Sequence, residues 1–351
     1  MKNKSVYHIA LAMALNAIVL PALAAATGPG MSYVTNQEDA VSVIDLATLE
    51  VTRTLEIGAR GPRGIGLTDD GAWLVTANMY DGNISVLDTK TGSLVRQVSI
   101  GKNPEFVRVV GQTAYVTFEP SSQSRGGPGP GEGNADREDD AKIPGHIAVV
   151  DLKSGKIVQD IVGKPETEGL EFSRDGSRMV VTNESDNSLG VYNMSTGELI
   201  NTVSVAQYGN RPRGIKLSPD GSTYLVTLER SDKLLVFNER LELIKALPTG
   251  KAPYGVAFNR RGDRAFVAAN RDKALEVFDT KTWEKIKVIP TGDRCWHFSF
   301  TPDDSRILLA CGKSNEVVVV DVDRLQVIKR IANLKTPWGI VSFPKSMGSI
   351  D

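Results

Sequence analysis

The sequence predicts an all-β protein, and three observations lead to this prediction. A short junction related to x-Pro-x-Gly recurs seven times along the 351 residues. Most steps between junctions are about 42 residues long, which suits four short strands with their turns. The segments at the two ends of the chain also complement each other. Together these observations predict a seven-bladed β-propeller made of four-stranded antiparallel blades.

The seven junctions mark where the blades begin. They vary in sequence but keep their spacing, apart from one step that is longer by about 20 residues because of an insertion. Along the chain they read Gly61-Pro62-Arg63-Gly64, Asn103-Pro104-Glu105, Lys164-Pro165-Glu166, Arg211-Pro212-Arg213-Gly214, Ala252-Pro253-Tyr254-Gly255, Arg294-Cys295-Trp296-His297 and Thr336-Pro337-Trp338-Gly339.

Within each repeat, β-branched and aromatic runs alternate with Gly, Asn and Asp, as a β-meander requires. Turns such as Ser218-Pro219-Asp220-Gly221 supply a glycine for positive φ between the first and second strands. The repeat from 252 to 292 predicts four strands, at 255–258, 264–269, 274–278 and 283–289.

The two ends of the chain supply complementary parts of one blade. After the N-terminal leader, the first strands predicted are second, third and fourth strands, at 33–36, 41–45 and 52–57. The chain ends with a lone first strand at 339–343. Pairing of that strand with the N-terminal strands closes the ring and removes its open edges.

The N-terminus has the pattern of a secretory signal peptide. Two lysines precede an apolar run at 9–20, and small residues follow at 22–24. We therefore expect residues 1–26 to be cleaved and residues 27–351 to form one propeller domain in the periplasm or outside the cell. No later segment reaches the roughly 18 apolar residues of a membrane span. The alternative for the N-terminal segment is that it stays uncleaved and anchors the protein in the membrane.

The composition bears on partners and cofactors. The net charge is −1, so no large basic field is available for nucleic acid. Only two histidines, His146 and His297, follow the leader, which is too few for a multi-histidine metal centre. The Gly-x-Ser-x-Gly motif, which marks a nucleophilic serine, is absent. We expect no nucleic-acid partner and no metal site, and the residues identify no cofactor.

Two parts of the chain resemble known families. The segments Tyr33-Val34-Thr35-Asn36 and Val41-Ser42-Val43-Ile44-Asp45 resemble the signature of YVTN-type seven-bladed propellers. The segments 294–303 and 336–341 resemble the C-terminal blades of exported propellers associated with PQQ-dependent catabolism of alcohols and related compounds. This resemblance implies a partner such as a quinoprotein dehydrogenase or its c-type cytochrome. His297 departs from that pattern, in which a plainer residue is common.

One residue from each blade is expected to enter the mouth of the central channel. A charged arc would then face an aromatic arc, which suits a small planar ligand that stacks on the rings and binds the arginines through acidic groups. Alternatively, the arginines neutralise the glutamates and the aromatic residues plug the channel. In blade order these residues are Arg63, Glu105, Glu168 (with Glu166 as the alternative), Arg213, Tyr254, Trp296 and Trp338.

His297 is the one weak candidate for a catalytic role. It should lie at the top of the seventh first strand, near the axis, where it could act as an axial ligand or general base, or simply be packed. His146 begins a third strand further out on another blade, so we expect no shared site. Glu105 and Glu168 could imitate the metal ligands of sugar-lactonase propellers, but hard cations prefer more oxygen ligands.

Two further features concern the blades themselves. The insertion at 119–142 is rich in Gly and Pro and then acidic, which fits a lid, a docking arm or a neutral excursion. A turn at 302–305 would place residue 296 opposite 311. A slip of one residue would then bring Cys295 and Cys311 within disulfide range.

Three functional hypotheses follow. The first, which we favour, is a periplasmic non-catalytic binding or accessory propeller that binds a small planar ligand or docks on a quinoprotein or cytochrome partner. The second is a cofactor-carrying or metal-dependent enzyme of tetrapyrrole or lactone chemistry that uses His297 and the channel carboxylates. The third is a structural cell-surface interaction module.

Overall fold

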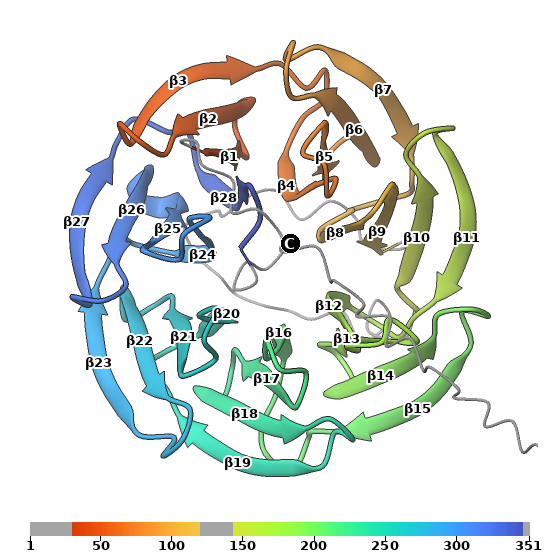
Figure 1. The fold of residues 1–351 in the computed structure, drawn as a ribbon. Helices are drawn as coiled ribbons and strands as arrows, with labels where there is room; N and C mark the ends of the chain where they lie inside the picture. The colour runs from red at the N-terminus through yellow and green to blue at the C-terminus, as the bar shows by residue number, and fades with distance from the viewer. Residues whose placement is uncertain (1–29, 120–142, 347–351) are drawn as a thin grey trace, which may run out of the picture.

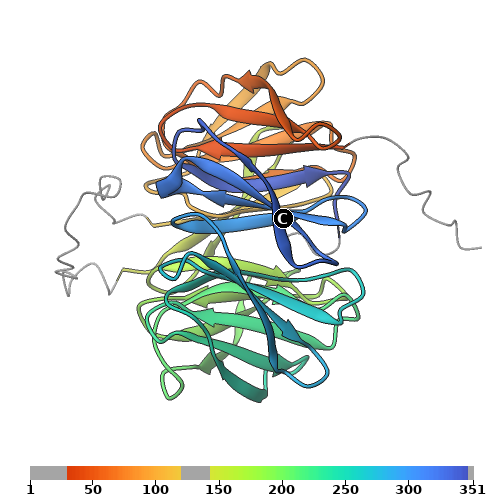
Figure 2. The same cartoon turned by 90° about the vertical axis from the view of Figure 1, so that its left-hand side faces the viewer.

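The computed structural model describes residues 30–119 and 143–346. The predicted signal peptide at 1–26 and nearly all of the insertion at 119–142 lie outside these residues. Within them, no helix is long and apolar enough to cross a membrane. The chain forms seven sheets, which Figure 1 shows set radially around a central axis. The side view in Figure 2 shows a disc that is shorter along its axis than across it.

Each sheet has four antiparallel strands that follow one another from the axis outwards. Blade 1 contains β28 (Pro337–Phe343), β1 (Met31–Asn36), β2 (Val41–Asp45) and β3 (Glu50–Leu55), and blade 2 contains β4 (Pro62–Leu67), β5 (Trp73–Asn78), β6 (Asn83–Asp88) and β7 (Leu94–Ser99). Blade 3 contains β8 (Val107–Val110), β9 (Thr113–Phe118), β10 (His146–Asp151) and β11 (Lys156–Val162), and blade 4 contains β12 (Thr167–Phe172), β13 (Arg178–Asn183), β14 (Ser188–Asn193) and β15 (Leu199–Ser204).

The remaining three blades follow the same order. Blade 5 contains β16 (Pro212–Leu217), β17 (Thr223–Leu228), β18 (Lys233–Asn238) and β19 (Leu243–Pro248), and blade 6 contains β20 (Pro253–Phe258), β21 (Arg264–Ala269), β22 (Ala274–Asp279) and β23 (Lys285–Pro290). Blade 7 contains β24 (Cys295–Phe300), β25 (Arg306–Cys311), β26 (Glu316–Asp321) and β27 (Gln326–Ile331), with a 3₁₀ turn at Gly312–Ser314.

The predicted closure of the ring is confirmed. β28 pairs antiparallel with β1, and Met31 faces Phe343 at one end while Val34 faces Ile340 further along. The edge of β1 that would otherwise be unpaired is thereby covered by the last strand of the chain. The N- and C-terminal parts of the propeller thus complete one blade between them.

The position of a strand in its blade decides its burial. The second strands are almost wholly buried, as in β13 and β17, whereas outer strands such as β15 are mostly exposed. The core therefore lies between the blades, where facing sheets interlock. Between blades 6 and 7, for example, the rings of Phe266 and Phe300 meet edge to face with centroids 5.5 Å apart.

Candidate functional site at the channel mouth

Most of the mouth residues lie where a first strand slips in register against its second strand. In blade 2, Pro62 pairs with Asn78 but Ile65 pairs with Thr76, so β4 has one more residue than β5 over this stretch. Such a bulge bends the strand and redirects a side chain. The same slip occurs in β12, β16, β20, β24 and β28. It also explains why β20 begins at Pro253, earlier than the predicted start at 255.

In three blades a threonine hydroxyl ties the bulge to the next blade. Thr35 Oγ1 donates a hydrogen bond to the carbonyl of Arg63 at 2.6 Å and accepts one from the N–H of Gly339 at 2.9 Å. The mouth residue of blade 2 is therefore held by blade 1. Thr182 and Thr227 make the same pair of bonds in blades 4 and 5, to Arg213 O and Gly169 N and to Tyr254 O and Gly214 N.

Glycine follows the mouth residue in five blades because the next blade comes too close for a side chain. A Cβ on Gly214 would lie 2.2 Å from the carbonyl oxygen of Tyr254, and one on Gly339 would lie 2.5 Å from that of Arg63. Blades 3 and 7 carry Phe106 and His297 at this position instead. These two positions add ring side chains to the channel just below the mouth.

The charged mouth residues pair with one another. Arg63 Nη1 forms an ion pair with Glu105 Oε1, and both side chains are largely buried. Arg213 Nη1 lies 3.4 Å from Glu168 Oε2 and 4.0 Å from Glu105 Oε2. One network therefore connects the charged residues of blades 2 to 5.

Three further residues, which the sequence analysis missed, complete this network. Glu184 and Glu229 each follow the last residue of a second strand, and Arg211 begins the junction of blade 5. Arg213 Nε lies 2.5 Å from Glu184 Oε1 and 3.1 Å from Glu229 Oε2. Arg211 Nε lies 2.7 Å from Glu184 Oε2 and 3.1 Å from Glu229 Oε2. The available signal was their shared position directly after a second strand.

Burial and charge pull the pKa values of this network in different directions. Burial raises the pKa of Glu184 well above its usual range, although Arg211 and Arg213 oppose this shift. Burial also raises the pKa of Glu168 against the effect of Arg213. For Glu229, Arg213 and Arg211 together outweigh burial and lower the pKa. Burial therefore favours the protonated forms of Glu168 and Glu184, whereas the arginines favour the charged form of Glu229.

The aromatic mouth residues form a packed cluster. Tyr254, Trp296 and Trp338 are 5%, 8% and 4% exposed and belong to one buried group. Arg213 connects this cluster to the charged network: its Nη1 donates a hydrogen bond to the Tyr254 hydroxyl, and its Cζ lies 4.4 Å from the Tyr254 ring centroid. Arg63 Cζ lies 5.9 Å from the Trp338 ring centroid.

The seven residues selected from the sequence therefore occupy one layer across the channel. Each arginine is paired with a glutamate, and the rings of Tyr254 and Trp338 meet edge to face with centroids 6.4 Å apart. This arrangement fits the alternative in which the arginines neutralise the glutamates and the aromatic residues plug the channel. A planar ligand at this level would have to displace these contacts.

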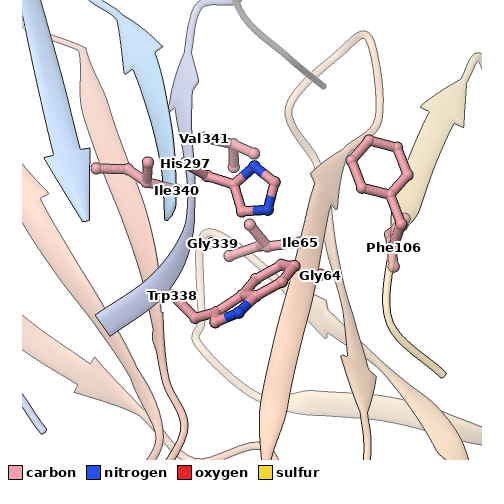
Figure 3. A pocket seen from close by; sticks show the side chains of 9 residues that line it. Gly64, Ile65, Phe106, His297, Trp338, Gly339, Ile340 and Val341 are labelled. Carbon is pink, nitrogen blue, oxygen red and sulfur yellow. The ribbon is translucent and has the colours of Figure 1, made fainter. Parts of the chain in front are cut away.

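His297 lies beneath this layer and faces a small cavity (Figure 3). Its ring centroid is 4.3 Å from that of Trp338, and the ring of Phe106 lies on the other side of the cavity at 6.3 Å. The space open to the centre of a water molecule is about 20 Å³, which holds about one water. Neither ring nitrogen has a hydrogen-bond partner among the described residues.

Burial, with a smaller effect of Arg213, lowers the pKa of His297 to about 3. The imidazole is therefore neutral at physiological pH and a weak base. His146 lies on β10 of blade 3, where its Nδ1 is 2.8 Å from a carboxylate oxygen of Asp160. The two histidines stand on different blades.

The predicted disulfide is confirmed. Cys295 is bonded to Cys311, the two residues being register partners of β24 and β25. His297 faces Ala310, so the register slips at Trp296, as the position of Cys295 required. The disulfide thus fixes the bulge that carries Trp296. Elsewhere in residues 30–119 and 143–346, no three His, Cys, Asp or Glu side chains gather closely enough to hold a metal ion.

Comparisons with known proteins agree on the fold. The family model described as "Lactonase, 7-bladed beta-propeller" matches residues 152–240, from blade 3 into blade 5. A search of curated proteins found no match.

Solved structures with little sequence identity superpose well. A functionally unknown protein from Desulfotomaculum acetoxidans DSM 771 is 15% identical, with 89% of this chain and 98% of that chain covered and a TM-score of 0.71. Kuenenia stuttgartiensis hydrazine synthase is 17% identical (83% and 92% covered, TM-score 0.69). The dihydro-heme d1 dehydrogenase NirN is 15% identical (88% and 74% covered, TM-score 0.65). These likenesses show a seven-bladed β-propeller fold.

Proposed function

We propose that this chain is a periplasmic accessory propeller without catalysis of its own, which docks on a partner protein through the face that carries the channel mouth. The observation behind this proposal is the closed layer at the mouth, where Arg63 and Arg213 are paired with Glu105 and Glu168. In such a layer, paired and packed side chains fill the centre of the face. A partner would contact the loops around it rather than a group inside the channel.

The chemistry of the mouth supports a non-catalytic role. A general base works best with a pKa near the working pH, and the pKa of His297 is far below that. The carboxylates of Glu105 and Glu168 are committed to arginines and largely buried. The partner class follows from the resemblance to exported PQQ-associated propellers and is a quinoprotein dehydrogenase or its c-type cytochrome.

The loops of blades 5 to 7 on the mouth face carry exposed basic side chains. Lys251 lies between β19 and β20, Arg271 in the β21–β22 loop and Lys313 in the β25–β26 loop. Transient redox encounters bury little surface and depend on complementary charge. We therefore expect an acidic patch on the partner to meet this side of the mouth face.

The test is a surface-binding measurement with the purified quinoprotein dehydrogenase and c-type cytochrome encoded nearest to this chain. Reversing charge on the mouth face (Lys251→Glu with Lys313→Glu) should slow association at least ten-fold at low salt. The matched control, Lys153→Glu with Lys281→Glu, changes exposed lysines in turns at the opposite end of the strands and should have no effect. Equal effects of both pairs, or no complex with either protein, would refute the proposal.

Lactone hydrolysis is the second candidate, because residues 152–240 match the lactonase propeller model. Glu105 and Glu168 would then be the channel carboxylates that serve the reaction. Acid release from glucono-δ-lactone, lost in Glu168→Gln, would favour this candidate over docking. An axial-ligand role of His297 for a tetrapyrrole has less support, because its cavity holds about one water.

A further inference from the structure

A second concave site lies away from the channel, on the mouth face between blades 1 and 2. The β1–β2 loop forms one wall, and the segment that joins β3 to β4 forms another. The groove has a volume of about 610 Å³, within the range of roughly 300–1,000 Å³ that small-molecule sites occupy. Its polar and aromatic lining includes Gln37, Glu38, Asp39, Glu56, Arg60 and Tyr80.

Two of the carboxylates in this groove are not neutralised by an ion pair. Arg60 is bound to Asp81 outside the groove, through Nε at 2.9 Å and Nη2 at 2.7 Å. Its charge is therefore not available to the groove acids. Glu38 accepts one hydrogen bond, from Thr336 Oγ1 at 2.8 Å, and exposed Glu56 has no hydrogen bond or ion pair with the described residues.

Gln37 adds a polar group to the lining of the groove. The residue is 7% exposed, and its side-chain amide makes no hydrogen bond with any described residue. The amide can therefore offer both a donor and an acceptor to a molecule in the groove.

Tyr80 gives the groove an aromatic wall. It is 38% exposed, and its ring packs directly on Gly61, where a Cβ would come within 2.4 Å of the ring. Gly61 has a φ of +68°, so both the backbone and the ring require glycine there. An aromatic face beside unpaired carboxylates is a favourable environment for an organic cation.

The protein itself places an alkylammonium against these acids. Lys335 Nζ lies 2.8 Å from Asp39 Oδ2, and the Lys335 side chain is 62% exposed. The hydrogen bond to Asp39 raises the pKa of Lys335, and Glu38 and Glu56 add to that effect. In the described part of the chain, no three of these acids gather closely enough to hold a metal ion. An organic cation therefore fits the groove better than a metal ion does.

We propose that this groove binds a small aliphatic di- or polyamine. Its ammonium groups pair with Glu38 and Glu56, its alkyl chain lies along Tyr80, and the Gln37 amide oxygen accepts one of its N–H groups. This site goes beyond the proposed docking function and does not depend on it, because it needs no partner protein. A failure of one proposal leaves the other unaffected.

Isothermal titration calorimetry of the purified protein with 1,4-diaminobutane and with spermidine tests the proposal. We expect saturable binding of one molecule, with no binding of the neutral isostere 1,4-butanediol. Glu56→Gln and Tyr80→Leu should each weaken binding at least ten-fold, and Lys335→Ala should strengthen it because the competing ammonium is removed. The control Glu198→Gln changes an exposed residue in the turn between β14 and β15 of blade 4, and it should leave binding unchanged.

Three results would overturn the proposal. The first is a heat of amine binding no larger than that of the diol, and the second is binding that Glu56→Gln does not weaken. The third is displacement of the amine by Mg²⁺ at the same concentration of positive charge. The last result would mean that the groove attracts any cation by charge alone.

Discussion

His297 and Phe106 occupy positions that are glycine in the other five blades, and they account for the cavity below the mouth. The imidazole is surrounded by aromatic rings and has no hydrogen-bond partner among the described residues. Because burial disfavours the charged form, the neutral form is strongly favoured. His297 is thus a buried ring with unused hydrogen-bonding capacity.

The low pKa of His297 predicts a pH dependence of stability. In the unfolded chain a histidine takes up a proton near pH 6.5, whereas in the folded protein it does so only near pH 3. Between these values the unfolded state binds more protons, so folding stability falls as the pH falls, by up to about 1.4 kcal/mol per pH unit. Above about pH 6.5 this contribution is constant.

Urea unfolding at pH 7 and pH 5 measures this effect. His297→Leu should lose less stability than the native protein between the two pH values, because the leucine cannot be protonated. A signal assigned to the His297 imidazole that titrates near pH 6.5, or equal losses for the two proteins, would contradict the buried neutral state.

Arg213 is the cation shared by most of the mouth carboxylates. Its removal would leave Glu168, Glu184 and Glu229 buried with less positive charge. Arg213→Met should therefore destabilise the protein by about 3–5 kcal/mol. Arg261→Met, at an exposed pair with Asp263, should cost less than about 1 kcal/mol in the same chemical denaturation experiment. Equal costs would mean that the mouth network contributes no more than a surface pair.

At the scale of the element, the bulged first strands carry the site. The sequence predicted strand order and closure, because turn residues such as those at 218–221 and the alternation of apolar runs repeat in every blade. It also predicted the slip at Cys295, because two cysteines had to meet across a hairpin. The shared position of Glu184 and Glu229 after a second strand pointed to the mouth face, but the sequence could not show that they reach the arginines, because that depends on loop geometry that the repeat does not encode.

The threonine that links neighbouring blades gives an element-scale prediction. Thr182→Val keeps the shape of the side chain but leaves Gly169 N and Arg213 O without this bond. Buried groups that lose a partner cost about 1–3 kcal/mol. Thr196→Val, at an exposed turn, should change unfolding free energy by less than about 0.5 kcal/mol. No difference between the two variants would show that the link between blades contributes little.

At the scale of the whole molecule, the ring is closed by pairing between the two ends of the chain. β28 and β1 complete blade 1, and β28 also carries Trp338 of the mouth. The closure and the site are therefore coupled. We expect a defect in the pairing of β28 with β1, the seam of the ring, to disturb the channel mouth as well.

Deletion of residues 337–351 tests that coupling. Loss of β28 would expose the edge of β1 and the buried faces of blades 7 and 2, so we expect aggregation or cooperative unfolding at room temperature. Circular dichroism and size-exclusion chromatography distinguish these outcomes from a folded ring. A folded, monomeric truncated protein would show that the seam is dispensable.

We infer that the mouth is closed by its own residues and that no small ligand occupies it. Native mass spectrometry of the protein purified gently from its native host, beside a Trp296→Ala/Trp338→Ala variant, tests this claim. We expect no adduct that depends on these tryptophans, and any amine in the groove should persist in this variant and disappear in Glu56→Gln. An adduct of a few hundred daltons that is lost only in the tryptophan variant would contradict the claim and establish a ligand at the mouth.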